Sequence, residues 1–166
     1  MNTSATSRTV GTPPHAELRF SALPAHVRTA RLVAVAMARR AGVEEGALDE
    51  VRLAVGEACS RAVALHRVHC PDELVTVELG DSAGRFVVRV LDQAGDLAEG
   101  PLAPAGDEIE LVDPAEPDDA ALPPGIGLAV IAGLVEDVEV RPGPDGGAVQ
   151  MSWPCQGGLA GVVTAP

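Results

Sequence analysis

The chain has 166 residues, which suits a single domain large enough to bury a hydrophobic core. Hydrophobic residues make up 46% of it but aromatic residues only 2%, so the core must be built mainly from Ala, Val and Leu. The formal net charge is −12, and all 12 basic residues are arginine. Because binding to phosphates needs a basic surface, this charge argues against direct nucleic-acid binding and favours a basic protein partner.

The cysteines and the ends of the chain bear on the cellular compartment. Cys59, Cys70 and Cys155 show no paired spacing, which is typical of a reducing cytoplasm. Residues 1–14 lack the apolar segment of a signal peptide. The uncharged residues of 146–166 are interrupted by a glutamine, prolines and several glycines, so they are not predicted to span a membrane. We therefore expect a cytoplasmic protein with no membrane segment.

The first part of the chain predicts one strand and two helices. Apolar residues alternate with polar or charged ones over residues 17–22, as in an edge strand. Pro24 suits the first position of a helix, whose apolar face repeats at helical spacing until Gly42 ends it. A second helix is predicted from about residue 45 to about 68, again with an apolar stripe at helical spacing.

The second part predicts two hairpins separated by a long loop and a short helix. In chain order, we expect strands at 74–79 and 85–91 joined by a turn at 81–84, a loop at 93–124, a helix at 127–135, and strands at 137–141 and 147–153 joined by a turn at 142–146. Between Val90 and Val140 the chain has 13 acidic residues and no basic one, so we expect the loop to be solvated and mobile.

This order of elements predicts an α+β fold. The expected architecture is a two-layer sandwich in which helices cover one face of a mixed, mainly antiparallel sheet. We expect one domain over residues 17–153, with a disordered N-terminus at 1–16, an acidic lid loop at 93–124 and a flexible tail at 154–166. Trp153, the only tryptophan, is expected in the core of the last strand.

A glycine pair, Gly125 and Gly127, opens the apolar third helix. Glycine lets the backbone approach an anion closely, and the first turn of a helix offers unpaired N–H groups at the positive end of its dipole. The segment therefore predicts a phosphate-binding corner. The alternative is a tight turn that only connects the loop to the helix.

Three segments, in this order, resemble the motifs of a known family. Residues 54–66 are similar to the N-box helix of the GHKL ATPases, specifically of the small anti-sigma factor serine/threonine kinases of bacterial partner-switching systems. Residues 90–96 resemble the first glycine box of that family, and residues 125–128 resemble the second. The resemblance extends over residues 17–153 and implies the GHKL, or Bergerat, ATP-binding fold.

The resemblance also implies a role for each box. Glu57 matches the glutamate that acts as general base toward a serine hydroxyl of the antagonist protein, a task that a carboxylate can perform. Asp92 matches the aspartate that hydrogen-bonds the adenine amino group; its alternative role is that of a turn residue at a strand end. The further residues implied to contact the nucleotide, ATP or ADP, are Gly95, Gly125, Ile126, Gly127 and Leu128.

The position four residues after Glu57 departs from the family pattern. The family has an asparagine there that holds Mg²⁺, whereas this chain has Arg61, and a guanidinium has no acceptor with which to ligate a cation. Arg61 is expected either to contact phosphates directly, without a metal, or to pair with Glu57. Such an i,i+4 pair is worth only about 0.3–0.5 kcal/mol on a helix surface. The sequence leaves both roles open and predicts no metal ligand at this site.

A second cluster, His66, His69 and Cys70, lies near the predicted end of the second helix. These residue types bind metals, but a cluster at a helix end with no fourth ligand is more typical of a structural role.

Three functions remain open at this point. The first is a regulatory protein that binds a sigma factor and is released by a STAS-type anti-anti-sigma partner. The second is an active serine kinase that phosphorylates the STAS antagonist through Glu57, and the third is a scaffold that binds no nucleotide. The resemblance also implies a homodimer formed through the first strand and helix.

Overall fold

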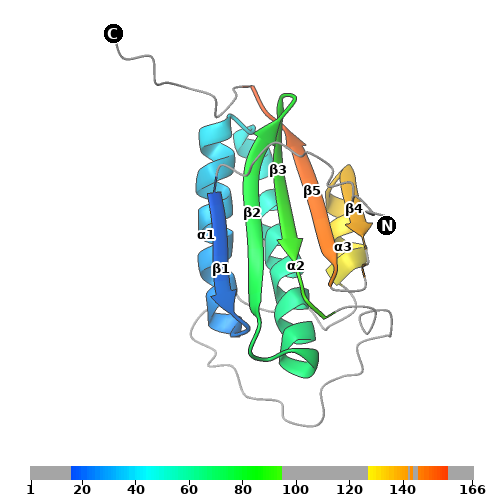
Figure 1. Ribbon diagram of the computed structural model, residues 1–166. Coiled ribbons are helices and arrows are strands. Elements are labelled where there is room, and N and C mark those ends of the chain that lie inside the picture. Colours follow the sequence, from blue (N-terminus) through cyan, green and yellow to red (C-terminus); the bar gives the residue numbers. More distant parts are fainter. Residues whose placement is uncertain (1–15, 95–126, 142, 144–145, 157–166) are drawn as a thin grey trace, which may run out of the picture.

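The computed structural model describes residues 16–94, 127–141, 143 and 146–156. The predicted loop at 93–124 falls almost wholly outside these residues, as do the predicted N-terminus and most of the predicted tail. The elements are β1 (Ala16–Ser21), α1 (Pro24–Ala41), the 3-10 helix η1 (Glu45–Ala47), α2 (Leu48–His69), β2 (Leu74–Ser82), β3 (Arg85–Leu91), α3 (Gly127–Leu134), β4 (Asp137–Arg141) and β5 (Ala148–Pro154). They form two layers, with the helices on one face of the sheet (Figure 1).

The sheet has five strands in the order β1-β2-β3-β5-β4, and every neighbouring pair is antiparallel. The predicted α+β sandwich is confirmed, and the sheet is more regular than the expected mixed one. Two helices, α1 and α2, connect β1 to β2, and β2 runs antiparallel to β1. Strand β4 runs parallel to β3, but β5 lies between them and pairs with both.

Helix α1 begins and ends where the sequence predicts. Pro24 occupies its first turn, and Gly42 ends it in the left-handed conformation with φ 85°. The Gly42 N–H group hydrogen-bonds the carbonyl oxygens of Ala38 and Arg39. The buried face of α1 is made almost wholly of alanine: Val27, Ala30, Ala34, Ala38 and Ala41. Small side chains at these positions let α1 pack closely on α2 and the sheet.

The core lies between the helices and the inner face of the central strands. Alternate residues of β2, β3 and β5 point toward the helices and are at most 3% exposed: Val75, Val77, Leu79, Phe86, Val88, Val90, Val149, Met151 and Trp153. Trp153 is in the core as predicted, and its indole N–H donates to Glu50 at 2.8 Å. The outer face carries polar residues instead, including Arg89, whose Nε donates to Gln150 at 2.7 Å.

The first hairpin is tighter than the sequence predicts. Strand β2 continues to Ser82, so the turn consists of Ala83 and Gly84 alone, with φ 52° and 76°. Two successive residues with positive φ match the right-handed twist of a hairpin. Asp81 and Ser82, whose polar side chains predict a place in the turn, instead pair with Phe86 and Arg85 of β3.

None of the helices within the described ranges is both long and apolar enough to cross a membrane. Cys59 is buried, and Cys70 and Cys155 are partly exposed.

Candidate functional site

Helix α2 carries Glu57 and Arg61 one turn apart, in the middle of the helical layer. The helix packs against α1, α3 and the sheet, so Glu57 is only 5% exposed. This burial raises the pKa of the Glu57 carboxyl above its ordinary value of 4.5, and the nearby charge of Arg31 acts in the opposite direction. A carboxylate whose pKa is raised toward neutrality is better matched to proton transfer at neutral pH.

Arg31 is a residue of this site that the sequence did not reveal. It extends from α1 onto α2, where its guanidinium lies against Gly56, and a Cβ atom on Gly56 would overlap it. The signal in the sequence was Gly56 itself, because a glycine inside a helix costs stability and indicates a close approach by another group.

Asp92 lies directly after β3 and is held by backbone hydrogen bonds. Its own N–H and C=O groups pair with the C=O and N–H groups of Gly147 at 2.9 and 3.1 Å. Its Oδ1 atom accepts from the N–H groups of Ala94 at 3.1 Å and Gly147 at 3.2 Å. Asp92 is 5% exposed, so this carboxylate is held in one orientation.

Gly147 is required for this arrangement. A Cβ atom on residue 147 would lie 2.8 Å from Asp92 Oδ2, which is closer than Cβ atoms come to other heavy atoms in folded proteins. The preceding Gly146 has φ 139°, a conformation that L side chains rarely adopt. The two glycines just before β5 thus leave room for the backbone and carboxylate of Asp92.

Arg61 pairs with Asp92 in the structure. Its Nη1 lies 3.5 Å from Asp92 Oδ2, and the two side chains are 17% and 3% exposed. Within the described residues, the expected i,i+4 pair with Glu57 is not the one formed. The physical reason is that Asp92 presents a buried carboxylate oxygen, Oδ2, to which no backbone N–H of the described residues donates. An ion pair between two residues on the surface of one helix contributes less to stability than a charge-assisted interaction with a buried carboxylate.

Two of the three segments that resemble the family motifs, residues 90–96 and 125–128, are only partly described. Gly127 and Leu128 lie in the first turn of α3, which packs beside α2. Gly95, Gly125 and Ile126 lie outside the described residues, so the predicted phosphate-binding corner stays a prediction.

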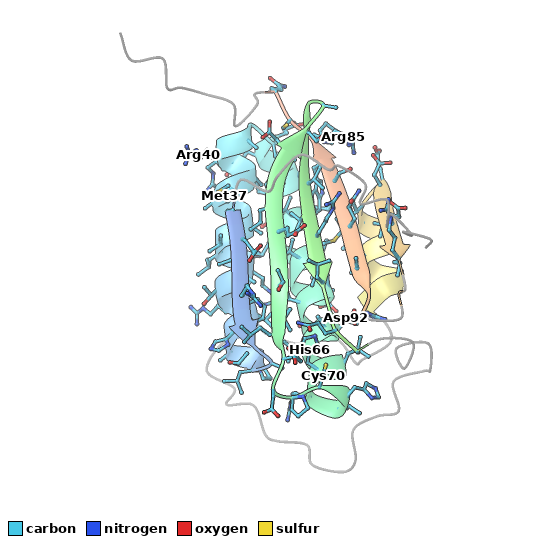
Figure 2. The ribbon with its side chains drawn as sticks, viewed as in Figure 1. Met37, Arg40, His66, Cys70, Arg85 and Asp92 are labelled. Carbon is cyan, nitrogen blue, oxygen red and sulfur yellow. The ribbon has the colours of Figure 1, made fainter. Side chains whose placement is uncertain are left out.

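Within the cluster of His66, His69 and Cys70 near the end of α2, His66 has a structural role. His66 is fully buried, and both ring nitrogens have backbone partners, Glu73 and Gln93. Over the described ranges, no group of three or more His, Cys, Asp or Glu side chains could hold a metal ion. Figure 2 shows His66 and Cys70 at the same end of the molecule as Asp92.

The site as described holds two acids and two arginines. Asp92 offers the oxygen that could accept a hydrogen bond from a nucleotide base, but Arg61 is already beside that oxygen. Glu57 is a buried carboxylate with the charge of Arg31 nearby. The negative charge of each acid is thus opposed by a guanidinium from this chain.

Comparisons with known proteins agree with this fold. Residues 20–153 match the family model described as the histidine kinase-like ATPase domain. Among solved structures, the chain is similar to the crystal structure of the RsbU and RsbW domains of Rv1364c from Mycobacterium tuberculosis, with 16% identity and a TM-score of 0.57. That match covers 89% of this chain and 35% of the other, and at this identity it shows the fold alone. No curated protein matches the chain.

The family model covers residues 20–153, which is most of the sequence, and the observed two-layer α+β sandwich agrees with it. The chain belongs to the histidine kinase-like ATPase domain family.

Proposed function

We propose that this chain is an anti-sigma-factor-like regulatory protein of a bacterial partner-switching system. It acts in the cytoplasm by binding a sigma factor, a STAS-type anti-anti-sigma protein, or both in turn. Its nucleotide site has lost affinity for Mg²⁺-ATP because Arg61 occupies it. Binding to protein partners, and not phosphoryl transfer, is then the main activity.

The ion pair between Arg61 and Asp92 carries this proposal. The resemblance gives Asp92 the task of accepting a hydrogen bond from the adenine amino group, and gives the position of Arg61 the task of holding Mg²⁺. A guanidinium cannot hold Mg²⁺. In its observed position it also competes with adenine for Oδ2, so one substitution weakens both ends of the site.

Nucleotide binding tests the proposal directly. Calorimetric titration with ATP and ADP, with and without Mg²⁺, should show weak binding by the natural protein and tighter, Mg²⁺-dependent binding by Arg61→Asn. We expect a gain of about tenfold or more, corresponding to one restored charge-assisted interaction of about 1.5–3 kcal/mol. Arg67→Asn is the matched control, because Arg67 is an exposed arginine of the same helix.

Two outcomes contradict the proposed state of the site. Micromolar binding of Mg²⁺-ATP by the natural protein would show that Arg61 does not weaken the site. Loss of ATP binding in Arg61→Asn would mean that Arg61 contacts the phosphates directly.

The partner side of the proposal has its own test. The tagged protein, isolated from its own cells, should retain a sigma factor or a STAS-domain protein that mass spectrometry identifies. Reconstitution from the two purified proteins then gives the affinity. Recovery of neither class of partner would rule the regulatory role out.

The alternative function, a serine kinase, is favoured by the burial of Glu57 and the resulting rise in the pKa of its carboxyl. A kinase transfers labelled phosphate from ATP to a serine of the cognate STAS protein, and Glu57→Ala abolishes the transfer. The absence of transfer by the natural protein would eliminate this alternative. The remaining alternative, a scaffold that binds no nucleotide, is supported if the titration detects neither ATP nor ADP in any condition.

A further inference from the structure

His66 is a fully buried polar residue near the end of α2. Its Nδ1 lies 3.1 Å from the carbonyl oxygen of Glu73, and its Nε2 lies 2.9 Å from the backbone nitrogen of Gln93. A carbonyl only accepts and a backbone N–H only donates, so these partners require a neutral ring with the proton on Nδ1. His66 therefore has one defined tautomer in the folded protein.

The two hydrogen bonds of His66 join it to two other segments, 7 and 27 residues away along the chain. The ring links α2 to the residue that precedes β2 and to the residue that follows Asp92. In Figure 2, His66 and Asp92 lie close together at the end of α2 and β3. The Gln93 side chain adds a second link, since its amide donates to the carbonyl of Leu74 at 3.3 Å.

Gln93 connects the His66 ring to the residues that hydrogen-bond the Asp92 carboxylate. The next residue, Ala94, donates its N–H to Asp92 Oδ1 at 3.1 Å. Gln93 lies between Asp92 and Ala94, and its N–H donates to the His66 ring at 2.9 Å, so the ring anchors the backbone that joins the two partners of this bond. With Oδ1 engaged by Ala94 and Gly147, Oδ2 is directed toward Arg61.

We propose that His66 is the positioning residue of Asp92. Its neutral ring holds the backbone of Gln93, so that the carboxylate directs Oδ2 into the nucleotide site. In assigning Asp92 to the recognition of the base, the inference rests on the function proposed above. A doubly protonated ring would present an N–H group to the N–H group of Gln93, and it could not hold the segment in this way.

Filling space and hydrogen bonding can be separated by two substitutions. In His66→Leu, an apolar side chain fills most of the volume but leaves the Gln93 N–H and the Glu73 carbonyl without the ring. In His66→Gln, the side-chain amide can accept from the Gln93 N–H. His69→Leu is the matched control, because His69 is an exposed histidine of the same helix end.

Nuclear magnetic resonance on the full chain without nucleotide tests the inference. The ring ¹⁵N shifts of the natural protein should identify the Nδ1–H tautomer, and a coupling across the hydrogen bond should connect His66 Nε2 with the Gln93 amide. In His66→Leu, the amides of Gln93 and Ala94 should exchange about fivefold to tenfold faster, as the loss of one buried hydrogen bond implies. The carboxyl ¹³C signal of Asp92 should also move. His66→Gln should restore both signals, and His69→Leu should change neither.

An Nε2–H tautomer in the natural protein would overturn the inference. So would a His66→Leu protein in which the Gln93 exchange rate and the Asp92 signal are unchanged. If His66→Leu does not fold, the tautomer and the coupling in the natural protein decide. These measurements need no nucleotide, so their outcome is independent of the titration that tests the proposed function.

Discussion

At the scale of single residues, the charges of the site are paired across elements and not along one helix. Arg61 is one helical turn from Glu57, but it forms an ion pair with Asp92, which lies just beyond the end of β3. Glu57 lies near Arg31 of α1 instead. Sequence spacing shows which pairs are geometrically available, whereas burial decides which pair forms, because an unpaired buried charge costs more than an exposed pair contributes.

The burial of Glu57 predicts a pH-dependent cost to stability. Burial raises the pKa of this carboxyl in the folded state, so the folded protein binds the proton more tightly than the unfolded chain does. The contribution of Glu57 to stability is thus fully present below about pH 4.5 and is lost as the pH rises through the folded-state pKa. Glu57→Gln, which stays neutral, should therefore be more stable than the natural protein at pH 7.

Urea unfolding at several pH values measures this effect. The stabilisation in Glu57→Gln should shrink as the pH falls toward 4.5, where both side chains are neutral in the folded state. Glu44→Gln, at an exposed position, serves as the control. A gain that is equal at all pH values would mean that side-chain ionisation is not its cause.

The three thiols should differ in reactivity. Burial raises the pKa of the Cys59 thiol to about 12, and the residue is 0% exposed. Because the thiolate is the reactive form, Cys59 should resist iodoacetamide in the folded protein, whereas the partly exposed Cys70 and Cys155 should react. Mass spectrometry of the labelled protein identifies the sites. Rapid native labelling of Cys59 would contradict its burial in the folded protein.

At the scale of elements, the contact between α1 and α2 depends on small residues. Alanines line the buried face of α1, and Gly56 of α2 makes room for Arg31. This pairing brings a cation to the helix that carries Glu57. The small side chains that permit this close contact also limit how much apolar surface area the two helices can bury against each other.

Gly56→Ala tests that contact. Its new methyl group would overlap the Arg31 guanidinium, so we expect a loss of about 1–3 kcal/mol in the free energy of unfolding, despite the better helix propensity of alanine. Gly133→Ala in α3 is the matched control, because the added methyl group meets nothing within 4 Å. That variant should gain about 0.5–1 kcal/mol. Equal gains in both variants would show that Arg31 moves away at no cost.

At the scale of the whole molecule, negative charge is distributed unevenly along the chain. The described residues contain 11 arginines and 14 acidic residues, which gives them a formal charge of −3. Residues 95–126 contain nine acidic residues and no basic one, so they hold most of the net charge of −12. Charge concentrated in this way accelerates association with a basic partner at low ionic strength.

Neutralising the acids of residues 96–119 should therefore slow binding to the proposed sigma-factor partner. With all nine replaced by Asn or Gln, we expect the association rate constant at low salt to fall by about tenfold or more. The salt dependence of the rate should largely disappear as well. Stopped-flow fluorescence over a range of ionic strength measures both. A rate that is unchanged at low salt would show that these residues do not steer the partner, whatever the equilibrium affinity.

The secondary structure of this protein could be predicted because its signals are local. Pro24 and Gly42 delimit α1, apolar periodicity marks α2, and alternation marks the strands. The sequence predicts too long a turn at 81–84, because the polar residues Asp81 and Ser82 pair with β3. Of the site, the sequence indicated Glu57, Arg61 and Asp92 but not Arg31, nor the partner of Arg61.

The sequence by itself determined the α+β class, the order of the elements, the aromatic-poor core and the motifs that indicate a nucleotide-binding family. These features depend on neighbouring residues, helical or strand periodicity and composition. The tertiary structure alone decided that Arg61 meets Asp92, that Arg31 lies on Gly56, and that His66 holds Gln93. Each of these contacts joins segments from different elements, and the pairing of buried polar groups is set by which ones the packed core brings together.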